Sequence, residues 1–184
     1  MAAKVKTRCS WCGDDPLYID YHDHEWGVPL HDDQELFELL MLEGFQAGLS
    51  WITVLRKREN FRRAFHQFDA KRIAALTQAD LDALAQDAGI IRNRLKIAAS
   101  VMNAKAYLAV REELGSFDTF IWSFAPAKRL KPEPRATSPE SDRMSKELLR
   151  RGFKFVGSTI CYAFMQASGL VDDHAPGCWK YRAR

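Results

Sequence analysis

The sequence predicts an all-α protein. Apolar residues recur three and four positions apart over several long stretches, which is the spacing of an amphipathic helix. No stretch alternates apolar and polar residues for long enough to indicate a half-buried strand. Capping residues precede the apolar runs, as where Asp32 is followed three positions later by Glu35. Helices are therefore expected to be the only regular elements.

The first quarter of the chain combines a segment without periodicity and the first helices. Residues 1–8 form a short basic tail, and residues 9–31 are rich in Cys, His, Tyr and Trp, so irregular structure is expected there. A helix is expected over about 32–44, with Asp32 as its N-cap. After a turn at 44–48, helical spacing resumes in the apolar residues Trp51, Val54, Phe61 and Phe65.

Capping residues place the next elements. Asp69 and Thr77 are expected to cap short helices over 70–76 and 78–87, and Asp80 completes a capping box with Thr77.

Gly89 breaks the pattern, and a long helix is expected to follow it and to run to Leu114, where Gly115 stops it. The residues on its predicted buried stripe are Ile91, Leu95, Ala98 and Met102. Aromatic residues over 117–124 are expected to pack on the core.

Proline marks the main break in the second half of the chain. Four of the seven prolines lie in 126–139, which is expected to be a loop. A basic amphipathic helix is expected over about 141–151, and a last helix is expected to follow 152–159 and to end near Gly169. The tail, 170–184, is expected to be irregular.

Composition bounds the class of protein. The 184 residues, 47% apolar and 28% charged, suit one soluble domain of two closely packed helical lobes over 1–184. A net charge of +3 permits nucleic-acid binding without demonstrating it. No apolar run is as long as a membrane span or resembles a signal peptide, so a cytoplasmic protein without a membrane partner is expected. The four cysteines are then expected to be reduced or metal-bound.

Glu43 stands at the centre of the most unusual stretch, residues 42–51. An apolar run precedes it, and a turn rich in Gly and Trp follows it. Burial would raise the pKa of this carboxyl group, which is a common property of functional carboxylates. A solvated glutamate on the rim of the core is the alternative.

The two irregular ends carry most of the potential metal ligands, and thiolates with imidazoles are the usual ligands of zinc. The candidates are Cys9, Cys12, His22, His24, His31, His174 and Cys178. By spacing alone, Cys9-x2-Cys12 with His174-x3-Cys178 is the neatest quartet. Scattered surface histidines and free thiols are the alternative, and a redox role for Cys9 and Cys12 is weaker because no βαβ pattern surrounds them.

Two further patterns suggest nucleic acid. The segment 147–173 has the layout of a helix-hairpin-helix, in which amides at a helix N-terminus bind phosphate, and Lys154, Arg150 and Arg151 add positive charge. A simple helix pair is the alternative. The aromatic residues near Glu43 suit a pocket for an extruded base, although each also suits a core; they are Trp11, Tyr18, Tyr21, Trp26 and Trp51.

Several of these blocks, in order from about residue 8 to 178, are similar to the type I DNA-3-methyladenine glycosylases. The matching blocks are Arg8-Cys9-x-Trp11, Asp15-Pro16-Leu17-Tyr18, Tyr21-His22-Asp23-x-Glu25-Trp26-Gly27, Leu42-Glu43-Gly44-x-Gln46-Ala47-Gly48-Leu49-Ser50-Trp51, Asp87-Ala88-Gly89-Ile90-Ile91-Arg92, Arg151-Gly152-Phe153-Lys154-Phe155-Val156-Gly157 and Asp173-His174.

The resemblance implies a monofunctional helix-hairpin-helix glycosylase that flips 3-methyladenine out of double-stranded DNA and hydrolyses its N-glycosidic bond, leaving an abasic site. It implies a monomer with no small-molecule cofactor. Glu43 would be the catalytic, base-recognising residue, and the five aromatic residues would line the pocket. The DNA-binding residues would be Gly48, Leu49, Lys154, Gly157 and Ser158. One structural zinc would tie the two ends of the chain through Cys9, His22, His174 and Cys178, which replaces Cys12 by His22.

One departure concerns the wider helix-hairpin-helix superfamily, many members of which carry a catalytic aspartate at a fixed distance after the hairpin. Here Asp172 and Asp173 follow Gly157 at a short interval, so neither is a secure equivalent. An N3-alkylated adenine is cationic and already a good leaving group, which lowers the need for acid catalysis. The alternative functions are a zinc-stapled helical DNA-binding module without catalysis and a thiol oxidoreductase.

Overall fold

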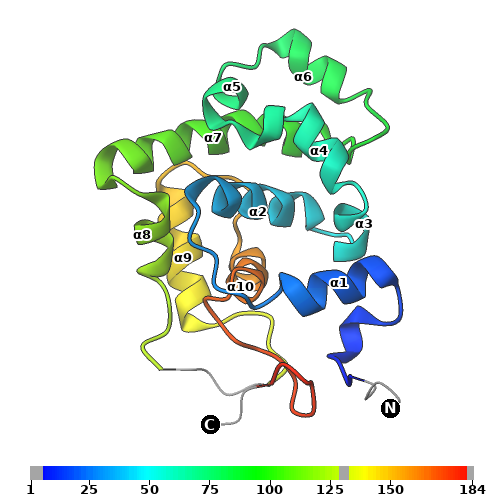
Figure 1. The fold of residues 1–184 in the computed structure, drawn as a ribbon. Coiled ribbons are helices and arrows are strands. Elements are labelled where there is room, and N and C mark those ends of the chain that lie inside the picture. Colours follow the sequence, from blue (N-terminus) through cyan, green and yellow to red (C-terminus); the bar gives the residue numbers. More distant parts are fainter. Residues whose placement is uncertain (1–5, 129–132, 182–184) are drawn as a thin grey trace.

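The computed structural model describes residues 6–128 and 133–181, and the regular elements within these ranges are all helical (Figure 1). The prediction of an all-α fold is confirmed. The helices are η1 (Ser10–Cys12), α1 (Pro16–His24), α2 (Asp33–Gln46), α3 (Trp51–Leu55), α4 (Arg58–Ala64), η2 (His66–Phe68), α5 (Ala70–Ala74), α6 (Gln78–Leu84), α7 (Arg94–Leu114), α8 (Phe117–Trp122), α9 (Pro139–Arg150) and α10 (Ser158–Ala167).

The predicted capping residues begin the helices as expected. The side chain of Asp32 accepts hydrogen bonds from two amides of the first turn of α2, and Asp69 does the same for α5. Thr77 and Asp80 form the predicted capping box of α6. Helix α9 begins two residues before its predicted start, because Ser138 caps it and Pro139 occupies its first position.

The expectation of irregular structure throughout residues 9–31 is wrong. Helix α1 lies in this segment, and the side chain of Asp15 caps it by accepting hydrogen bonds from the amides of Leu17 and Tyr18. Asp15 followed by Pro16 is a recognisable helix start. Because α1 exists, Tyr18, Tyr21 and His22 are held on a helix rather than a loop.

The predicted buried stripe of the long helix is also wrong. Helix α7 begins at Arg94, after the N-cap Asn93, and the side chain of Leu95 is 74% exposed. The buried face instead includes Lys96, Ser100 and Asn103. These polar side chains are buried because hydrogen bonds satisfy each of them.

Helix α2 lies at the centre of the molecule, in contact with α3, α7, α8 and α10 (Figure 1). Buried residues run along it from Leu36 to Phe45, so it is covered on several sides. The aromatic residues Phe117 and Phe120 of α8 pack on the core as predicted. None of the described helices combines the length and the apolar composition that a membrane span requires.

The predicted Pro-rich loop is described only in part. Residues 126–128 and 133–138 of the predicted Pro-rich loop lie outside regular helices, and its residues 129–132 are outside the described ranges.

The N-terminal and C-terminal segments meet, since the amide of Trp179 donates to the carbonyl of Thr7 over 2.8 Å.

Candidate functional site

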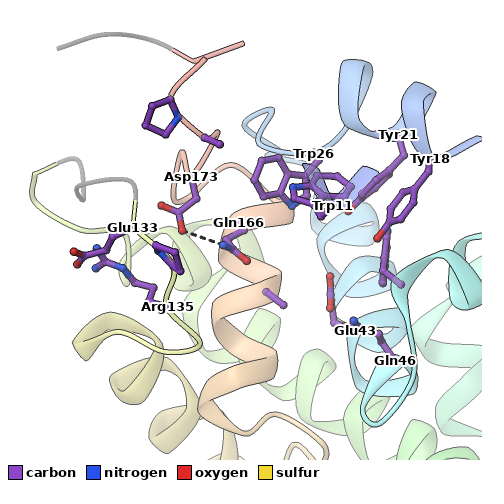
Figure 2. A pocket seen from close by; sticks show the side chains of 15 residues that line it. Trp11, Tyr18, Tyr21, Trp26, Glu43, Gln46, Glu133, Arg135, Gln166 and Asp173 are labelled. Carbon is purple, nitrogen blue, oxygen red and sulfur yellow. Dashed lines mark hydrogen bonds and ion pairs between the residues drawn. The ribbon is translucent and has the colours of Figure 1, made fainter. Parts of the chain in front are cut away.

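A cavity of about 410 Å³ opens between α1, α2 and the C-terminal segment. Figure 2 shows Glu43 on one side, with Gln166 and Asp173 on the other. The structure brings together in the lining of this cavity all six residues that were predicted to bind a base, namely Trp11, Tyr18, Tyr21, Trp26, Glu43 and Trp51.

The aromatic side chains form a continuous wall. The ring centroid of Trp11 lies 5.0 Å from those of both Tyr18 and Trp26, and Tyr21 lies 5.6 Å from Trp51. Trp11 is 37% exposed, whereas Tyr21 and Trp51 are buried. Burial raises the pKa of Tyr21 well above its usual value, so its phenol stays neutral. The wall thus presents flat, uncharged faces to a ligand.

Glu43 is the buried polar group of this wall. It lies on α2, is 3% exposed, and its Oε2 atom has no hydrogen-bond partner. Burial raises its pKa to about 8, which favours the protonated form of the carboxyl group at neutral pH. The indole Nε1 of Trp51 is also buried and unpartnered. Because unpaired buried polar atoms are costly, a donor and an acceptor left open in one cavity indicate a ligand site.

Some lining residues were not predicted. Gln46 lies one helical turn after Glu43, so helical spacing alone points to it. Gln166 donates from Nε2 to Oδ2 of Asp173 over 2.9 Å, and the hydroxyl of Tyr162 donates to the same oxygen over 2.5 Å. The remaining oxygen of Asp173 is buried without a partner. No local sequence signal pairs these residues. The other unpredicted lining residues are Glu133, Pro134, Arg135, Ala163, Ala175 and Pro176.

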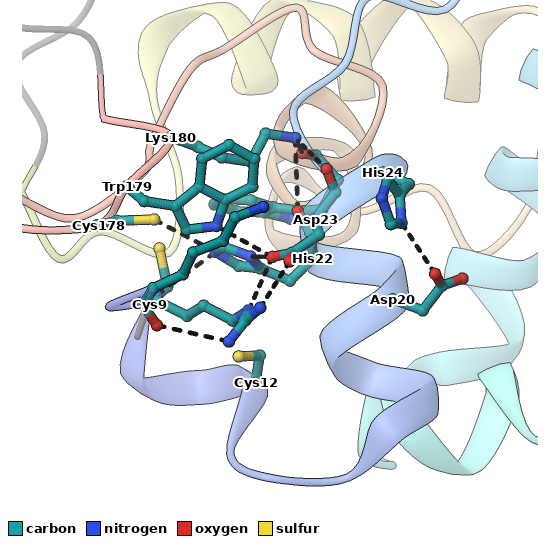
Figure 3. Close-up of polar contacts among 12 residues, drawn as sticks. Cys9, Cys12, Asp20, His22, Asp23, His24, Cys178, Trp179 and Lys180 are labelled. Carbon is teal, nitrogen blue, oxygen red and sulfur yellow. Dashed lines mark hydrogen bonds and ion pairs between the residues drawn. The ribbon is translucent and has the colours of Figure 1, made fainter. Parts of the chain in front are cut away.

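Three of the four predicted metal ligands converge in the described part of the chain. Donor atoms of Cys9, His22 and Cys178 lie within 4.8 Å of one another, and all three residues are buried (Figure 3). Nε2 of His22 is 3.4 Å from Sγ of Cys178. Two ligands of a zinc tetrahedron are about 3.3 to 3.8 Å apart, given bond lengths of about 2.0 to 2.3 Å. The group therefore suits a metal ion.

His174 lies beside this group but is not among the three residues whose donor atoms converge. Its ring centroid is 5.4 Å from that of His22. Its Nδ1 is hydrogen-bonded to Asp172 over 2.9 Å, and its Nε2 is buried without a partner. A carboxylate on one nitrogen and a free second nitrogen is the usual environment of a metal-binding histidine. His22 also has a carboxylate on Nδ1, that of Asp23 over 2.9 Å, but its Nε2 is in contact with the amide of Cys9 and with Sγ of Cys178, each over 3.4 Å.

Gly27 makes room for the His174 ring. Its φ of +73° is in the left-handed region, and a Cβ there would lie 2.6 Å from Cε1 of His174.

Cys12 does not join the group, so the quartet suggested by spacing alone is wrong. Its thiol donates to the carbonyl of Gly13 instead. The other two histidines that the sequence offered are engaged elsewhere, His24 with Asp20 and His31 with Asp118.

Polar contacts between the ends of the chain surround the metal-ligand group. Both oxygens of Asp23 accept hydrogen bonds from the guanidinium of Arg8, over 2.8 and 2.7 Å, and Oδ1 accepts another from Trp179. The Arg8 contact holds the pKa of Asp23 well below its usual range. Nζ of Lys180 donates to the carbonyl of Asp23 over 3.1 Å. The two ends are therefore joined by hydrogen bonds as well as by the potential ligands (Figure 3).

The predicted DNA-contacting residues lie on two turns. Gly48, with φ of +83°, and Leu49, 43% exposed, form the turn between α2 and α3. Lys154 lies in the hairpin between α9 and α10, and Gly157 is the N-cap of α10. The hydroxyl of Ser158 is bonded to Ser141 over 2.8 Å, so the group of Ser158 that remains for a phosphate is its amide.

The comparisons with known proteins agree with this fold. A sequence profile of the methyladenine glycosylase family matches residues 11–181, and the chain belongs to this family. DNA-3-methyladenine glycosylase 1 of Escherichia coli (strain K12) is 56% identical over 181 residues, which cover 95% of this chain and 96% of the relative.

Solved structures of this family superpose closely on the chain. A crystal structure of 3-methyladenine DNA glycosylase I is 53% identical with a TM-score of 0.92, covering 96% of this chain and 100% of that one. A single-residue variant of a 3-methyladenine DNA glycosylase I, crystallised in complex with 3-methyladenine, is 38% identical with a TM-score of 0.89, covering 94% and 96%.

Proposed function

We propose that this chain is a DNA-3-methyladenine glycosylase. It flips the alkylated base out of double-stranded DNA, hydrolyses the N-glycosidic bond and leaves an abasic site, without lyase activity. The observation that carries this proposal is the unpaired, buried carboxyl group of Glu43 inside an aromatic cavity. The names of the relatives support the same reaction, and one relative was solved with 3-methyladenine bound.

Glu43 provides selectivity through charge and hydrogen bonding. In the empty cavity its pKa is about 8, and a positive charge nearby favours the ionised form. A base alkylated at N3 carries that charge while it is attached to the sugar. Entry of the cationic base therefore ionises Glu43, and the carboxylate accepts hydrogen bonds from the base. Neutral adenine carries no such charge, so the energetic cost of burying the carboxyl group of Glu43 is not offset when adenine binds.

The aromatic wall provides the remaining affinity. Any extruded base can stack on aromatic faces, whichever hydrogen-bonding groups its edges present. Such stacking contributes about 1–3 kcal/mol of binding free energy per base. Trp11 and Tyr18 lie near the more exposed part of the wall, and Tyr21 and Trp51 form its buried part. Trp51 also offers its open indole N–H as a donor to the base or to the attacking water. Stacking binds the base, and Glu43 distinguishes the alkylated form.

The metal in this proposal is one zinc ion, bound by Cys9, His22, His174 and Cys178. Two buried thiols and two imidazoles, each imidazole with a carboxylate on Nδ1, match a structural zinc site. A zinc with four protein ligands has no open position, so it stabilises the junction of the two ends and takes no part in hydrolysis.

The DNA surface is formed by the turn at Gly48 and Leu49 and by the hairpin at Lys154. In this proposal Leu49 occupies the gap left in the duplex by the extruded nucleotide, and the amides of Gly157 and Ser158 bind a phosphate. Lys154→Ala then weakens binding to all sequences alike and reduces the salt dependence by about one phosphate contact. The protein acts as a single domain over 1–184 and as a monomer.

Three measurements on Glu43→Gln test the proposal. Release of 3-methyladenine from methylated duplex DNA and affinity for the free base should both fall. Affinity for DNA with an abasic analogue should stay within about twofold, because phosphate contacts supply most of it. If the wild-type protein binds duplex DNA but releases no free base, it is a zinc-stapled binding module rather than a glycosylase.

A further inference from the structure

Helix α7 contacts both turns that form the proposed DNA surface. The residues involved are Lys96 and Asn103, which lie about two helical turns apart on the same buried face. Their polar atoms bind backbone groups that are distant in sequence, from residues 45–47 and from residue 154. Neither residue lines the cavity that holds Glu43.

Lys96 binds the C-terminal end of α2. Its Nζ donates to the carbonyl of Phe45 over 2.8 Å and to that of Ala47 over 2.6 Å, and the side chain as a whole is only 7% exposed. The last carbonyls of a helix have no partners within the helix and carry partial negative charge. Helix α2 has no basic residue in its own last turn, so α7 supplies the cation. The next residues are Gly48 and Leu49.

Asn103 both donates a hydrogen bond to the hairpin backbone and accepts one from it. Its Oδ1 accepts from the amide of Lys154 over 2.7 Å, and its Nδ2 donates to the carbonyl of the same residue over 3.1 Å. The hairpin also packs on α2, because a Cβ on Gly44 would lie 3.5 Å from Cβ of Phe155. The ring of Phe155 is 5.8 Å from the ammonium of Lys96. Helices α2 and α7 and the hairpin therefore meet at one point.

We infer that Lys96 is a positioning residue for base extrusion. It fixes the Leu49 turn relative to the hairpin that Asn103 holds on the same helix. Insertion of a side chain into a duplex requires that the turn and the phosphate-binding hairpin keep a fixed separation, since a displacement of about 1 Å is enough to slow an enzyme severely. This inference rests on the proposed function, because it assigns Lys96 a role that acts through Leu49.

The test is a double-mutant cycle between Lys96→Met and Leu49→Ala. Lys96→Met keeps most of the side-chain volume and removes the ammonium. Excision of 3-methyladenine from methylated duplex DNA is measured under single-turnover conditions. Each single variant should be slower by about tenfold or more. The double variant should be no slower than Leu49→Ala alone, because the anchor has no effect once the inserted side chain is absent.

A spectroscopic signal separates insertion from general stability. With 2-aminopurine placed opposite an abasic analogue in a duplex, the fluorescence change on binding should be largely lost in Lys96→Met. Affinity of the variant for free 3-methyladenine should stay within about twofold of the wild type, because Lys96 does not contact the base. If Lys96→Met does not fold, Lys96→Leu, which also removes the donor, is used in the same cycle.

Ser100→Ala is the matched control. Ser100 lies on α7 between the two anchors, is fully buried, and bonds only within its own helix, to the carbonyl of Lys96 over 3.1 Å. Its loss should lower thermal stability and leave the rate of excision and the fluorescence change as in the wild type.

The outcomes distinguish the inference from the proposed function. If Leu49→Ala slows excision but Lys96→Met does not, or if the two effects add, then Lys96 does not act through the turn. If Leu49→Ala is as fast as the wild type, the insertion role of Leu49 fails, and the role of Lys96 fails with it. If the wild-type protein releases no free base at all, the proposed function itself is wrong.

Discussion

Glu43 and Asp23 are both buried carboxyl groups, and their environments are opposite. Asp23, at the junction of the chain ends, accepts hydrogen bonds from Arg8 and Trp179, and its pKa is lowered. Glu43 has an oxygen without any partner, and burial raises its pKa to about 8. The contrast separates a carboxyl group whose hydrogen bonds the fold satisfies from one that the fold leaves unpaired.

The difference shows that burial of a carboxyl group does not by itself decide whether the group is ionised. Burial disfavours the ionised form of any acid, and donors or cations nearby reverse that preference. At the junction the protein supplies these partners itself, so ionisation of Asp23 stabilises the fold. At the cavity it supplies none, so in the proposed mechanism ionisation of Glu43 at neutral pH depends on a cationic guest. The predictions below test each half of this contrast.

The largest expected effect is on the junction. His174→Ala should abolish zinc binding and lower the free energy of unfolding by about 3 kcal/mol or more, because metal binding adds directly to folding. Cys12→Ser is the control and should keep the metal, since Cys12 lies outside the ligand group. Metal content by mass spectrometry and urea unfolding measure both. If zinc is lost in Cys12→Ser but retained in His174→Ala, then Cys12 rather than His174 is a metal ligand.

The second effect is on catalysis. If the carboxylate form of Glu43 is needed, kcat/KM for excision should rise with pH by roughly tenfold per unit below its pKa and level off above it, since kcat/KM reports the free enzyme. That plateau is expected near the pKa of about 8. Glu43→Gln should be slower by about a hundredfold and should show no such rise. A rise that persists in Glu43→Gln assigns the ionisation to another group.

The third effect links the same carboxyl group to stability. The pKa of Glu43 is raised from its usual 4.5 to about 8, so the folded state retains a proton that the unfolded state loses over this range. Stability of the wild type, relative to Glu43→Gln, should therefore fall by roughly 2 kcal/mol between pH 5.5 and pH 7.5. Urea unfolding at both pH values, without ligand, measures this. Equal changes in the two proteins would mean that Glu43 is already ionised in the empty cavity.

The smallest expected effect is on the stability that Asp23 contributes, whose dependence on pH is opposite to that of Glu43. The lowered pKa of Asp23 stabilises the fold above pH 3.8, the ordinary value, and this contribution is lost as the pH falls further. Asp23→Asn should therefore reduce the free energy of unfolding by roughly 1–2 kcal/mol, equally at pH 5.5 and pH 7.5. Adding Arg8→Met should cause less loss than the two single changes summed. Strict additivity would show that the ion pair contributes nothing of its own.

The parts of the fold that follow from local chemistry were predictable. Asp32, Asp69 and Thr77 cap helices because of residues within one turn of themselves, so the sequence contains the whole signal. Helix α1 carries such a signal in Asp15-Pro16, and the dense aromatic and histidine residues around it obscured its periodicity. The residues around Glu43 indicated the aromatic pocket, whereas similarity to a known family was needed to choose the proposed metal ligands, which no local pattern joins.

The parts that depend on distant contacts were not predictable. Lys96 and Asn103 are polar residues on a buried helix face, and only the backbone groups of residues 45–47 and 154 explain why they are there. The same holds for Asp173, which faces the cavity from the segment that follows α10, the last of the described helices. A period of 3.6 residues identifies a helix, but it does not identify its partners.

The contribution of Asp173, Ala175 and Pro176 to the cavity has a consequence for the order of folding. These residues follow α10, and they reach the cavity only when the last segment has docked against residues near the start of the chain. Contacts of such large sequence separation form late, because a long loop must be closed first. During synthesis, the side of the cavity formed by these three residues is therefore missing until they have been made and have docked. If the hairpin binds DNA as proposed, a partly folded chain that has done so still has no closed cavity in which to cleave a base.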